Sequence, residues 1–211
     1  MTSKIKIAKA LLKIKAVFLR PDEPFTWASG IKSPIYCDNR LILSYPDERN
    51  LVENSMSELI RTSYPDAEII MGTATAGIAH AAMIAERLNL PMGYVRSSVK
   101  DHGRKNQIEG RISKGQKAVV VEDLISTASS VLECVNALRD EGVNVLGIAS
   151  IFTYSMKKGI MNLKEAGITN NSLCDIDTLL RVAADEEYIT SDDVTRILKF
   201  RDNPSDESWR N

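Results

Sequence analysis

Short apolar runs alternate with amphipathic segments through the middle of the chain. The runs are EIIMG, PMGYV, KAVVVED and NVLGIASIF, at residues 68–72, 91–95, 117–123 and 144–152. The segment IAHAAMIAERL follows the first run, and VLECVNALRDEG follows the third. Apolar runs of this length, separated by helices, predict βαβ units and a mostly parallel sheet with helices on its faces.

The two ends of the chain follow other patterns. Apolar positions recur at helical spacing from about 4 to 19, and two prolines follow. The stretch FTWASGIKSPIYCDNR (25–40) predicts short extended pieces and turns. Residues 47–63 predict a helix, 160–190 predict alternating helix and turn, and ITSDDVTRILKF (189–200) predicts a last helix. We therefore expect one α/β domain over residues 1–211, with a core of about 46–154 framed by N- and C-terminal extensions.

Composition narrows the class of protein. The chain has 27 basic and 28 acidic side chains, and its net charge of −1 gives no overall attraction to nucleic acid or to an anionic membrane. Three widely spaced cysteines without a CxxC pair argue against a disulfide scaffold or a zinc site and favour a cytoplasmic protein. No stretch approaches the ~18 apolar residues of a membrane span, so the lysine-rich first helix is expected to be amphipathic with a solvated face.

The stretch VVVEDLISTASS (119–130) places two acids and four hydroxyls after a buried-looking strand. Backbone N–H groups at a helix N-terminus and hydroxyl donors bind anions. Glu122 and Asp123 cannot hold a phosphate, but they can accept hydrogen bonds from vicinal sugar hydroxyls or lie near a metal. The pattern suits a ribose 5-phosphate. The alternative is simple N-capping, which accounts for one hydroxyl and leaves the others unexplained.

Two further loops follow predicted strands. In GTATAG (72–77), small residues allow a ligand to approach the backbone closely, although many strand-to-helix turns look alike. In YVRSSVKDHGRKNQIEG (94–110), five potential cations fall within ten residues and suit a pyrophosphate, unless the segment is only a solvated loop. His80 lies among alanines in a predicted helix and is expected to be structural.

These segments resemble the type I phosphoribosyltransferases. VVVEDLISTASS resembles their phosphoribosyl pyrophosphate motif, and FTWASGIKSPIYCDNR, GTATAGIAHA, YVRSSVKDHGRKNQIEG and FRDNPSDESWR are similar to the orotate branch of that family. The resemblance runs in order from about Phe25 to Trp209. It implies the family's α/β fold, a mostly parallel sheet flanked by helices, with a small hood formed by about 1–45 and parts of 155–211.

The resemblance also implies roles for individual residues. Glu122 and Asp123 would bind the ribose 2′- and 3′-hydroxyls, the segment Ser126 to Ser130 the 5-phosphate, and Thr73 to Gly77 the pyrophosphate side. Lys100, His102 and Asp123 would be catalytic, and the region Phe25 to Lys32 would face orotate. The full set of expected substrate-binding residues is Lys32, Thr73, Ala74, Thr75, Ala76, Gly77, Arg96, Lys100, His102, Glu122, Asp123, Leu124, Ile125, Ser126, Thr127, Ala128, Ser129 and Ser130.

The phosphate motif departs from the family at two positions. Glycines are usual where this chain has Ala128 and Ser129. The methyl group at 128 is expected either to crowd the phosphate or to be tolerated with a negative φ.

The chain also lacks several cations that are common in the family. Serines stand at 97 and 98, and alanines at 28 and 76, where many members carry lysine. Each lost charge-assisted hydrogen bond is worth ~1.5–3 kcal/mol, so weaker pyrophosphate binding is expected. Arg96, Lys100 and His102 are retained, which indicates that the activity survives.

The activity implied by the resemblance is transfer of the 5-phosphoribosyl group from phosphoribosyl pyrophosphate to orotate, giving orotidine 5′-monophosphate and pyrophosphate. Mg²⁺ is the implied cofactor, held through the substrate and by no direct side-chain ligand. The 100–112 loop would be shared between the subunits of a homodimer. The alternatives are a phosphoribosyltransferase for another nucleobase, a non-catalytic regulator that senses phosphoribosyl pyrophosphate, and an inactive paralogue.

Overall fold

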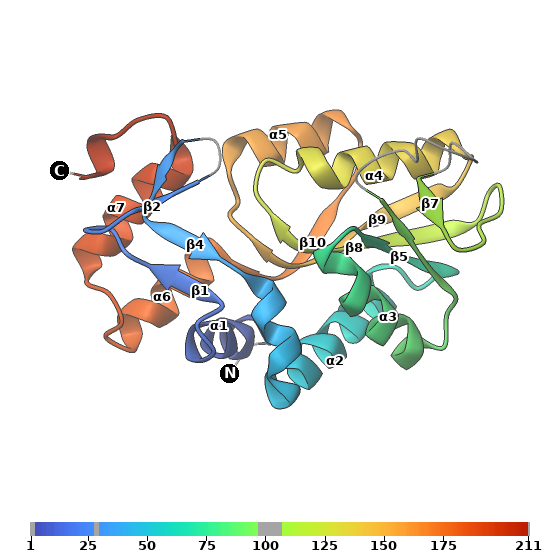
Figure 1. Ribbon diagram of the computed structural model, residues 1–211, viewed down its shortest axis with the longest axis horizontal. Helices are drawn as coiled ribbons and strands as arrows, with labels where there is room; N and C mark the ends of the chain where they lie inside the picture. Colours follow the sequence, from blue (N-terminus) through green and yellow to red (C-terminus); the bar gives the residue numbers. More distant parts are fainter. Residues whose placement is uncertain (1–2, 28–29, 97–106, 211) are drawn as a thin grey trace.

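A computed structural model describes residues 3–27, 30–96 and 107–210 of the chain (Figure 1). Its centre is a six-stranded sheet in the order β10-β9-β8-β5-β6-β7. Neighbouring strands are parallel except β6 and β7, which are antiparallel. The strands are β5 (Ile69–Thr73), β6 (Met92–Val95), β7 (Ile108–Glu109), β8 (Lys117–Ile125), β9 (Asn144–Thr153) and β10 (Asn170–Asp175). The predicted α/β fold with a mostly parallel sheet is confirmed.

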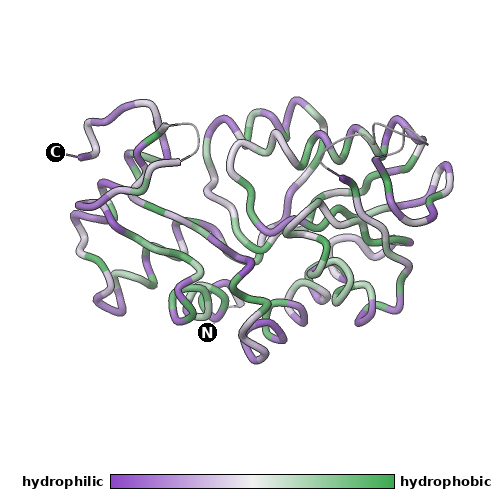
Figure 2. Tube along the Cα trace, in the orientation of Figure 1, coloured by the Kyte–Doolittle hydropathy of each residue, from purple (hydrophilic) through white to green (hydrophobic). Residues whose placement is uncertain are grey.

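Helices cover both faces of the sheet (Figure 1). One face carries α2 (Pro46–Ser63) and α3 (Ala76–Leu88), and the other carries α4 (Ser129–Asp140) and α5 (Lys157–Glu165). Strand β8 serves both layers, because Val119 packs in the first and Val120 in the second. Alternation of side chains along a strand buried on both faces explains the unbroken run of valines. Figure 2 shows that hydrophilic positions gather on the outer turns.

The two ends of the chain lie together beside the sheet, at the left of Figure 1. Their elements are α1 (Ser3–Lys13), β1 (Val17–Leu19), β2 (Phe25–Thr26), β3 (Lys32–Ser33), β4 (Ile35–Cys37), η1 (Asn39–Ser44), α6 (Ile176–Asp185), α7 (Ser191–Asp202) and η2 (Ser208–Arg210). Phe200 packs edge-on against both Trp27 and Trp209, and Arg196 donates to the Pro21 carbonyl. These contacts fix the N-terminal strands on the C-terminal helices.

The predicted first helix is too long. The helix in the structure, α1, ends at Lys13, and residues 17–19 form β1, which pairs antiparallel with β4. Val17, Phe18 and Leu19 favour a strand intrinsically, and a partner strand 18 residues later in the chain decides the outcome. Among the described residues, no helix is both long and apolar enough to cross a membrane.

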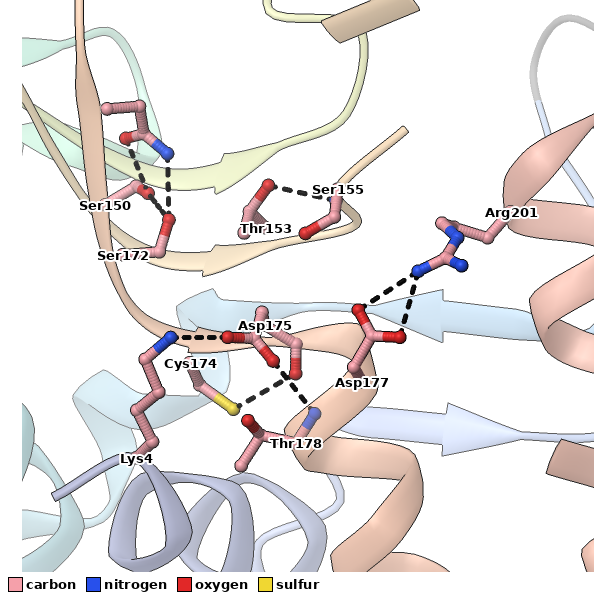
Figure 3. Close-up of polar contacts among 11 residues, drawn as sticks. Lys4, Ser150, Thr153, Ser155, Ser172, Cys174, Asp175, Asp177, Thr178 and Arg201 are labelled. Atoms are coloured by element: carbon pink, nitrogen blue, oxygen red, sulfur yellow. Dashed lines mark hydrogen bonds and ion pairs between the residues drawn. The ribbon is translucent and has the colours of Figure 1, made fainter. Parts of the chain in front are cut away.

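The prediction of only helix and turn over 160–190 is also wrong, because it misses the edge strand β10. The polar sequence Asn170-Asn171-Ser172 does not resemble a strand, but polar side chains of the neighbouring strand form hydrogen bonds with it (Figure 3). The Ser150 hydroxyl lies 2.6 Å from that of Ser172 and donates to Asn170 Oδ1 at 2.9 Å. Asp175 ends the strand, caps α6 by accepting from Thr178 N at 2.8 Å, and pairs with a lysine of α1.

Candidate active site

A cavity of about 350 Å³ opens at the carboxyl ends of β5, β6 and β8. Strands β5 and β8 are neighbours in the sheet, but the chain leaves them in opposite directions. It continues from β5 to β6 on one side and from β8 to β9 on the other, so the loops after β5 and β8 diverge. Such a switch point is where parallel α/β sheets bind ligands. The lining residues are Thr73, Ala74, Thr75, Ala76, Val95, Arg96, Gln107, Glu122, Asp123, Leu124, Ser126, Ser130, Glu133 and Cys134.

The two acids lie side by side at the end of β8. Glu122 is buried, and its Oε1 accepts a hydrogen bond from the backbone N–H of Asp123 at 2.9 Å. Burial raises the pKa of Glu122 to about 8, with a further increase from the Asp123 carboxyl and a partial offset from Thr73. The raised pKa favours the protonated form of Glu122, which avoids two adjacent negative charges.

This raised pKa predicts a pH-dependent stability. The Glu122 carboxyl has a pKa of about 8 in the folded chain and 4.5 as its ordinary value, so the folded state binds more protons between them. The contribution of this carboxyl to the free energy of unfolding is therefore fully present below about pH 4.5, and it is lost as the pH rises toward and through 8. Glu122→Gln imitates the protonated carboxyl. Thermal melts should show little change near pH 4.5 and a higher melting temperature than the wild type above pH 8.

Glu133→Gln is the matched control for that prediction, because Glu133 lines the same cavity but is exposed on α4. It should leave the pH profile of the melting temperature unchanged. A Glu122→Gln profile parallel to the wild type over the whole range would contradict a buried proton on Glu122.

The segment 126–130, called the hydroxyl loop below, connects β8 to α4. Its N-cap is Ala128, with φ 63° and ψ 6°, and no side chain caps the helix. This left-handed backbone excludes one of the two expected alternatives, that the methyl group is tolerated with a negative φ. It also explains why a glycine would suit the position, since alanine adopts such angles at a cost. Because no hydroxyl is used as the cap, simple N-capping does not account for the serines and threonine.

The loop after β5 comes close to β8 through its glycine. A Cβ on Gly77 would lie 2.5 Å from both the Val121 carbonyl oxygen and Thr73 Oγ1, so only glycine lets α3 begin here. Thr73 Oγ1 donates to the same carbonyl at 3.2 Å. The Ala74–Thr75 peptide bond is cis. Residues Thr73 to Ala76 line the cavity.

Arg96 directly follows β6 and supplies a cation to the cavity. Its backbone N–H donates to the Gln107 carbonyl at 2.8 Å, and its Nη1 lies 4.0 Å from Glu109 Oε1. That Nη1 is buried and makes no hydrogen bond to any described residue. A buried guanidinium nitrogen without an acceptor fits a site that receives an anion.

The structure gathers about half of the predicted set around this cavity. Thr73, Ala74, Thr75, Ala76, Arg96, Glu122, Asp123, Leu124, Ser126 and Ser130 line it. Thr127, Ala128 and Ser129 belong to the hydroxyl loop, Ile125 ends β8 and Gly77 lies in the first turn of α3, and none of them lines the cavity. Lys32 does not line it either, and is exposed on β3 with its ammonium group 2.7 Å from Thr26 Oγ1. Lys100 and His102, like positions 28, 97 and 98, lie outside the described residues.

Four lining residues were not predicted: Val95, Gln107, Glu133 and Cys134. Helical spacing from Ser130 places Glu133 and Cys134 on the same side of α4, which is a signal that the sequence did carry. Burial raises the pKa of the Cys134 thiol to about 12, so it stays protonated. His80 lies between α2 and α3, buried, with Nδ1 2.5 Å from Glu53 Oε1, a position that suits a structural residue.

Comparisons with known proteins agree with this arrangement. A family model described as the phosphoribosyl transferase domain matches residues 42–167. The chain is 58% identical over 206 residues to the orotate phosphoribosyltransferase of Bacillus pumilus, covering 98% of this chain and 97% of that protein. It is 52% identical over 210 residues to that of Streptococcus mutans, covering all of both chains. The crystal structure of orotate phosphoribosyltransferase from Aeropyrum pernix superposes with a TM-score of 0.75 at 30% identity, covering 87% of this chain and 99% of that one.

Proposed function

The chain belongs to the phosphoribosyltransferase family, in its orotate branch, and we propose from this that it transfers the 5-phosphoribosyl group from phosphoribosyl pyrophosphate to orotate. The products are orotidine 5′-monophosphate and pyrophosphate, a step of pyrimidine synthesis. The observation that carries the proposal is the cavity at the switch point, where an acid pair, a hydroxyl loop and a guanidinium nitrogen without a hydrogen-bond acceptor meet.

Each part of the cavity suits one part of phosphoribosyl pyrophosphate. The carboxyl groups of Glu122 and Asp123 take the two ribose hydroxyls, which donate hydrogen bonds that a phosphate cannot. The N–H groups and hydroxyls of residues 126–130 take the 5-phosphate at the start of α4. Arg96 and the backbone of the β5 loop take the pyrophosphate. Residues 25–32, within the hood of residues 1–45 and parts of 155–211, take orotate.

The reaction requires stabilisation of developing charge more than it requires a strong base. The bond between the anomeric carbon and the pyrophosphate oxygen breaks, so positive charge grows on the ribose and negative charge on the leaving group. Asp123 stabilises the first, and Arg96, Lys100 and His102 stabilise the second. Orotate is already an anion and attacks from a fixed position. Protonated His102 gives its proton to the departing pyrophosphate.

Mg²⁺ fits the residues present. A magnesium ion keeps several waters and is held in proteins by one or two carboxylates together with substrate phosphates. Asp123 places a carboxylate beside the cavity where the ribose hydroxyls would lie, so the ion would be held through oxygens of the substrate and by no direct side-chain ligand. Bound in this way, Mg²⁺ would supply Lewis-acid stabilisation of the negative charge that grows on the leaving pyrophosphate.

The active form in this proposal is a cytoplasmic homodimer. The structure places residues 108–109 of the expected 100–112 loop in β7 of the chain's own sheet. The part before β7, which contains Lys100 and His102, is the part that we propose to act in the site of the partner subunit, so that each complete site uses residues of two chains. The net charge of −1 and the absence of a basic domain in the sequence fit a protein that binds neither nucleic acid nor membrane.

The experiment that tests the proposal follows the absorbance of orotate. We expect it to fall when purified protein, phosphoribosyl pyrophosphate and Mg²⁺ are all present, and to stay constant when any one is omitted. Uracil and hypoxanthine in place of orotate test for another nucleobase. Binding of phosphoribosyl pyrophosphate without turnover of any base would point to a regulator, and no binding at all to an inactive paralogue.

A further inference from the structure

We propose that Asn39 and Asn162 are positioning residues that hold the phosphate-binding segment from behind, through its backbone carbonyls. Both donate a side-chain N–H to a carbonyl of the segment 123–128, and neither lines the cavity. The inference rests on the proposed function, because it assigns the two amides to affinity for the phosphoribosyl group.

Asn39 reaches the acid pair from the N-terminal part of the chain. Its side chain is completely buried, and Nδ2 donates to the backbone carbonyl of Asp123 at 2.7 Å. Its Oδ1 accepts from Cys37 Sγ at 3.3 Å, which fixes the orientation of the amide. Burial and the Asp123 carboxylate raise the pKa of the Cys37 thiol, so the thiol keeps the proton that it donates. Asn39 thus joins η1 to the residue expected to bind ribose.

Asn162 reaches the hydroxyl loop from α5. Its Nδ2 donates to the backbone carbonyl of Thr127 at 2.9 Å. One turn earlier in the helix, Gly159 packs against the loop so closely that a Cβ there would lie 2.3 Å from the Ser126 carbonyl oxygen. Helix α5 can therefore approach only through a glycine, and this approach is what brings Asn162 within hydrogen-bonding distance.

Two further carbonyls of the segment also have partners. The Ile125 carbonyl accepts from Tyr154 N at 2.9 Å, and that of Ala128 accepts from Leu132 N at 3.0 Å. Carbonyls at 123, 125, 127 and 128 are therefore held by groups that do not line the cavity. With these four oxygens bound elsewhere, the segment presents fewer acceptors to an anion, while its N–H and hydroxyl donors can face it.

Pre-organisation of this kind acts on affinity. A loop already fixed in its binding conformation does not lose conformational freedom when the phosphate arrives, and its donors need no rearrangement. Removing Asn39 or Asn162 takes away no contact with the substrate, so any loss of phosphoribosyl binding comes through the loop. A residue that served stability alone would lower the melting temperature and leave that binding unchanged.

The test compares Asn162→Ala, Asn162→Asp and Asn39→Ala with the wild type, with Asn136→Ala as matched control on the exposed face of α4. Calorimetry measures the Kd of ribose 5-phosphate, and steady-state rates give KM for phosphoribosyl pyrophosphate, KM for orotate and kcat. For each alanine variant we expect Kd and the first KM to rise roughly three- to tenfold, the size of one net hydrogen bond. KM for orotate should stay within about twofold of the wild-type value, a smaller change than the loss of one hydrogen bond would produce.

Asn162→Asp sharpens the test, because it keeps the side-chain size but turns an oxygen toward the Thr127 carbonyl. It should weaken ribose 5-phosphate binding more than Asn162→Ala. Asn39 is fully buried, so if Asn39→Ala fails to fold, the half-buried Asn162 decides the question. Folded variants with wild-type Kd and KM for the phosphoribosyl substrate overturn the inference. A wild-type protein that neither binds ribose 5-phosphate nor consumes orotate overturns the proposed function instead.

Discussion

Asp123→Asn is expected to lower kcat by about 10²–10³-fold while leaving the melting temperature almost unchanged. The carboxylate lines the cavity and is half-exposed, so its loss removes a negative charge beside the ribose without leaving a hole in the core. Its backbone is held independently by Asn39 and by Glu122, and an amide of the same size keeps that geometry. Steady-state rates measured beside a thermal melt would give both quantities.

Asp140→Asn is the matched control, since Asp140 is exposed at the end of α4, the helix that follows the hydroxyl loop. It should match the wild type in rate and in melting temperature. If Asp123→Asn retained a near-normal kcat, the assignment of the acid pair to the ribose would be lost, and with it the role of Asp123 toward the growing positive charge.

Lys100→Ala is expected to lower kcat by about 10²-fold or more, again with little change in stability. The prediction comes from the sequence: the lysine lies in a polar segment with few apolar residues, at the position that the orotate branch uses toward pyrophosphate. With serines at 97 and 98, the chain has fewer cations there to replace it. Lys6→Ala, on the exposed face of α1, is the control, and unchanged turnover of Lys100→Ala would defeat the assignment.

The same two variants test the shared loop. In a mixed dimer of Lys100→Ala and Asp123→Asn chains, one of the two sites combines the wild-type Asp123 of one chain with the wild-type Lys100 of the other. Random mixing after reversible dissociation should then restore about a quarter of wild-type activity, because half of the dimers are mixed and each has one intact site. A mixture as inactive as its components would mean that each loop serves its own chain.

The sequence carried the parallel strands and their helices because both faces of the sheet are buried. Four apolar runs gave β5, β6, β8 and β9 to within two residues at each end, and Gly142, with φ 78°, follows the end of α4 as the pattern indicated. The Thr190 capping box likewise begins α7 where the Ser/Thr-Asp pattern predicted. In each case the pattern of nearby residues was sufficient to predict the element, because residues close in sequence determine it.

Elements decided by distant partners could not be read in this way. Residues 17–19 continue an amphipathic pattern, yet they pair with β4, and the polar β10 exists because Ser150 of the neighbouring strand satisfies its side chains. The same holds within the site. The sequence motif predicted Glu122, Asp123 and the hydroxyl loop as parts of the site. It did not predict the left-handed backbone of Ala128, the raised pKa of Glu122 or the two asparagine amides behind the loop.

By itself, the order of residues determined which chemical groups this protein brings to the end of β8, because a strand and the loop after it are continuous in the chain. Only the tertiary structure decided how those groups are charged and held. Burial sets the protonation of Glu122, and the asparagines that fix the loop lie 84 residues before Asp123 and 35 residues after Thr127. A side chain's neighbours across such separations depend on how layers pack, and no local pattern records that.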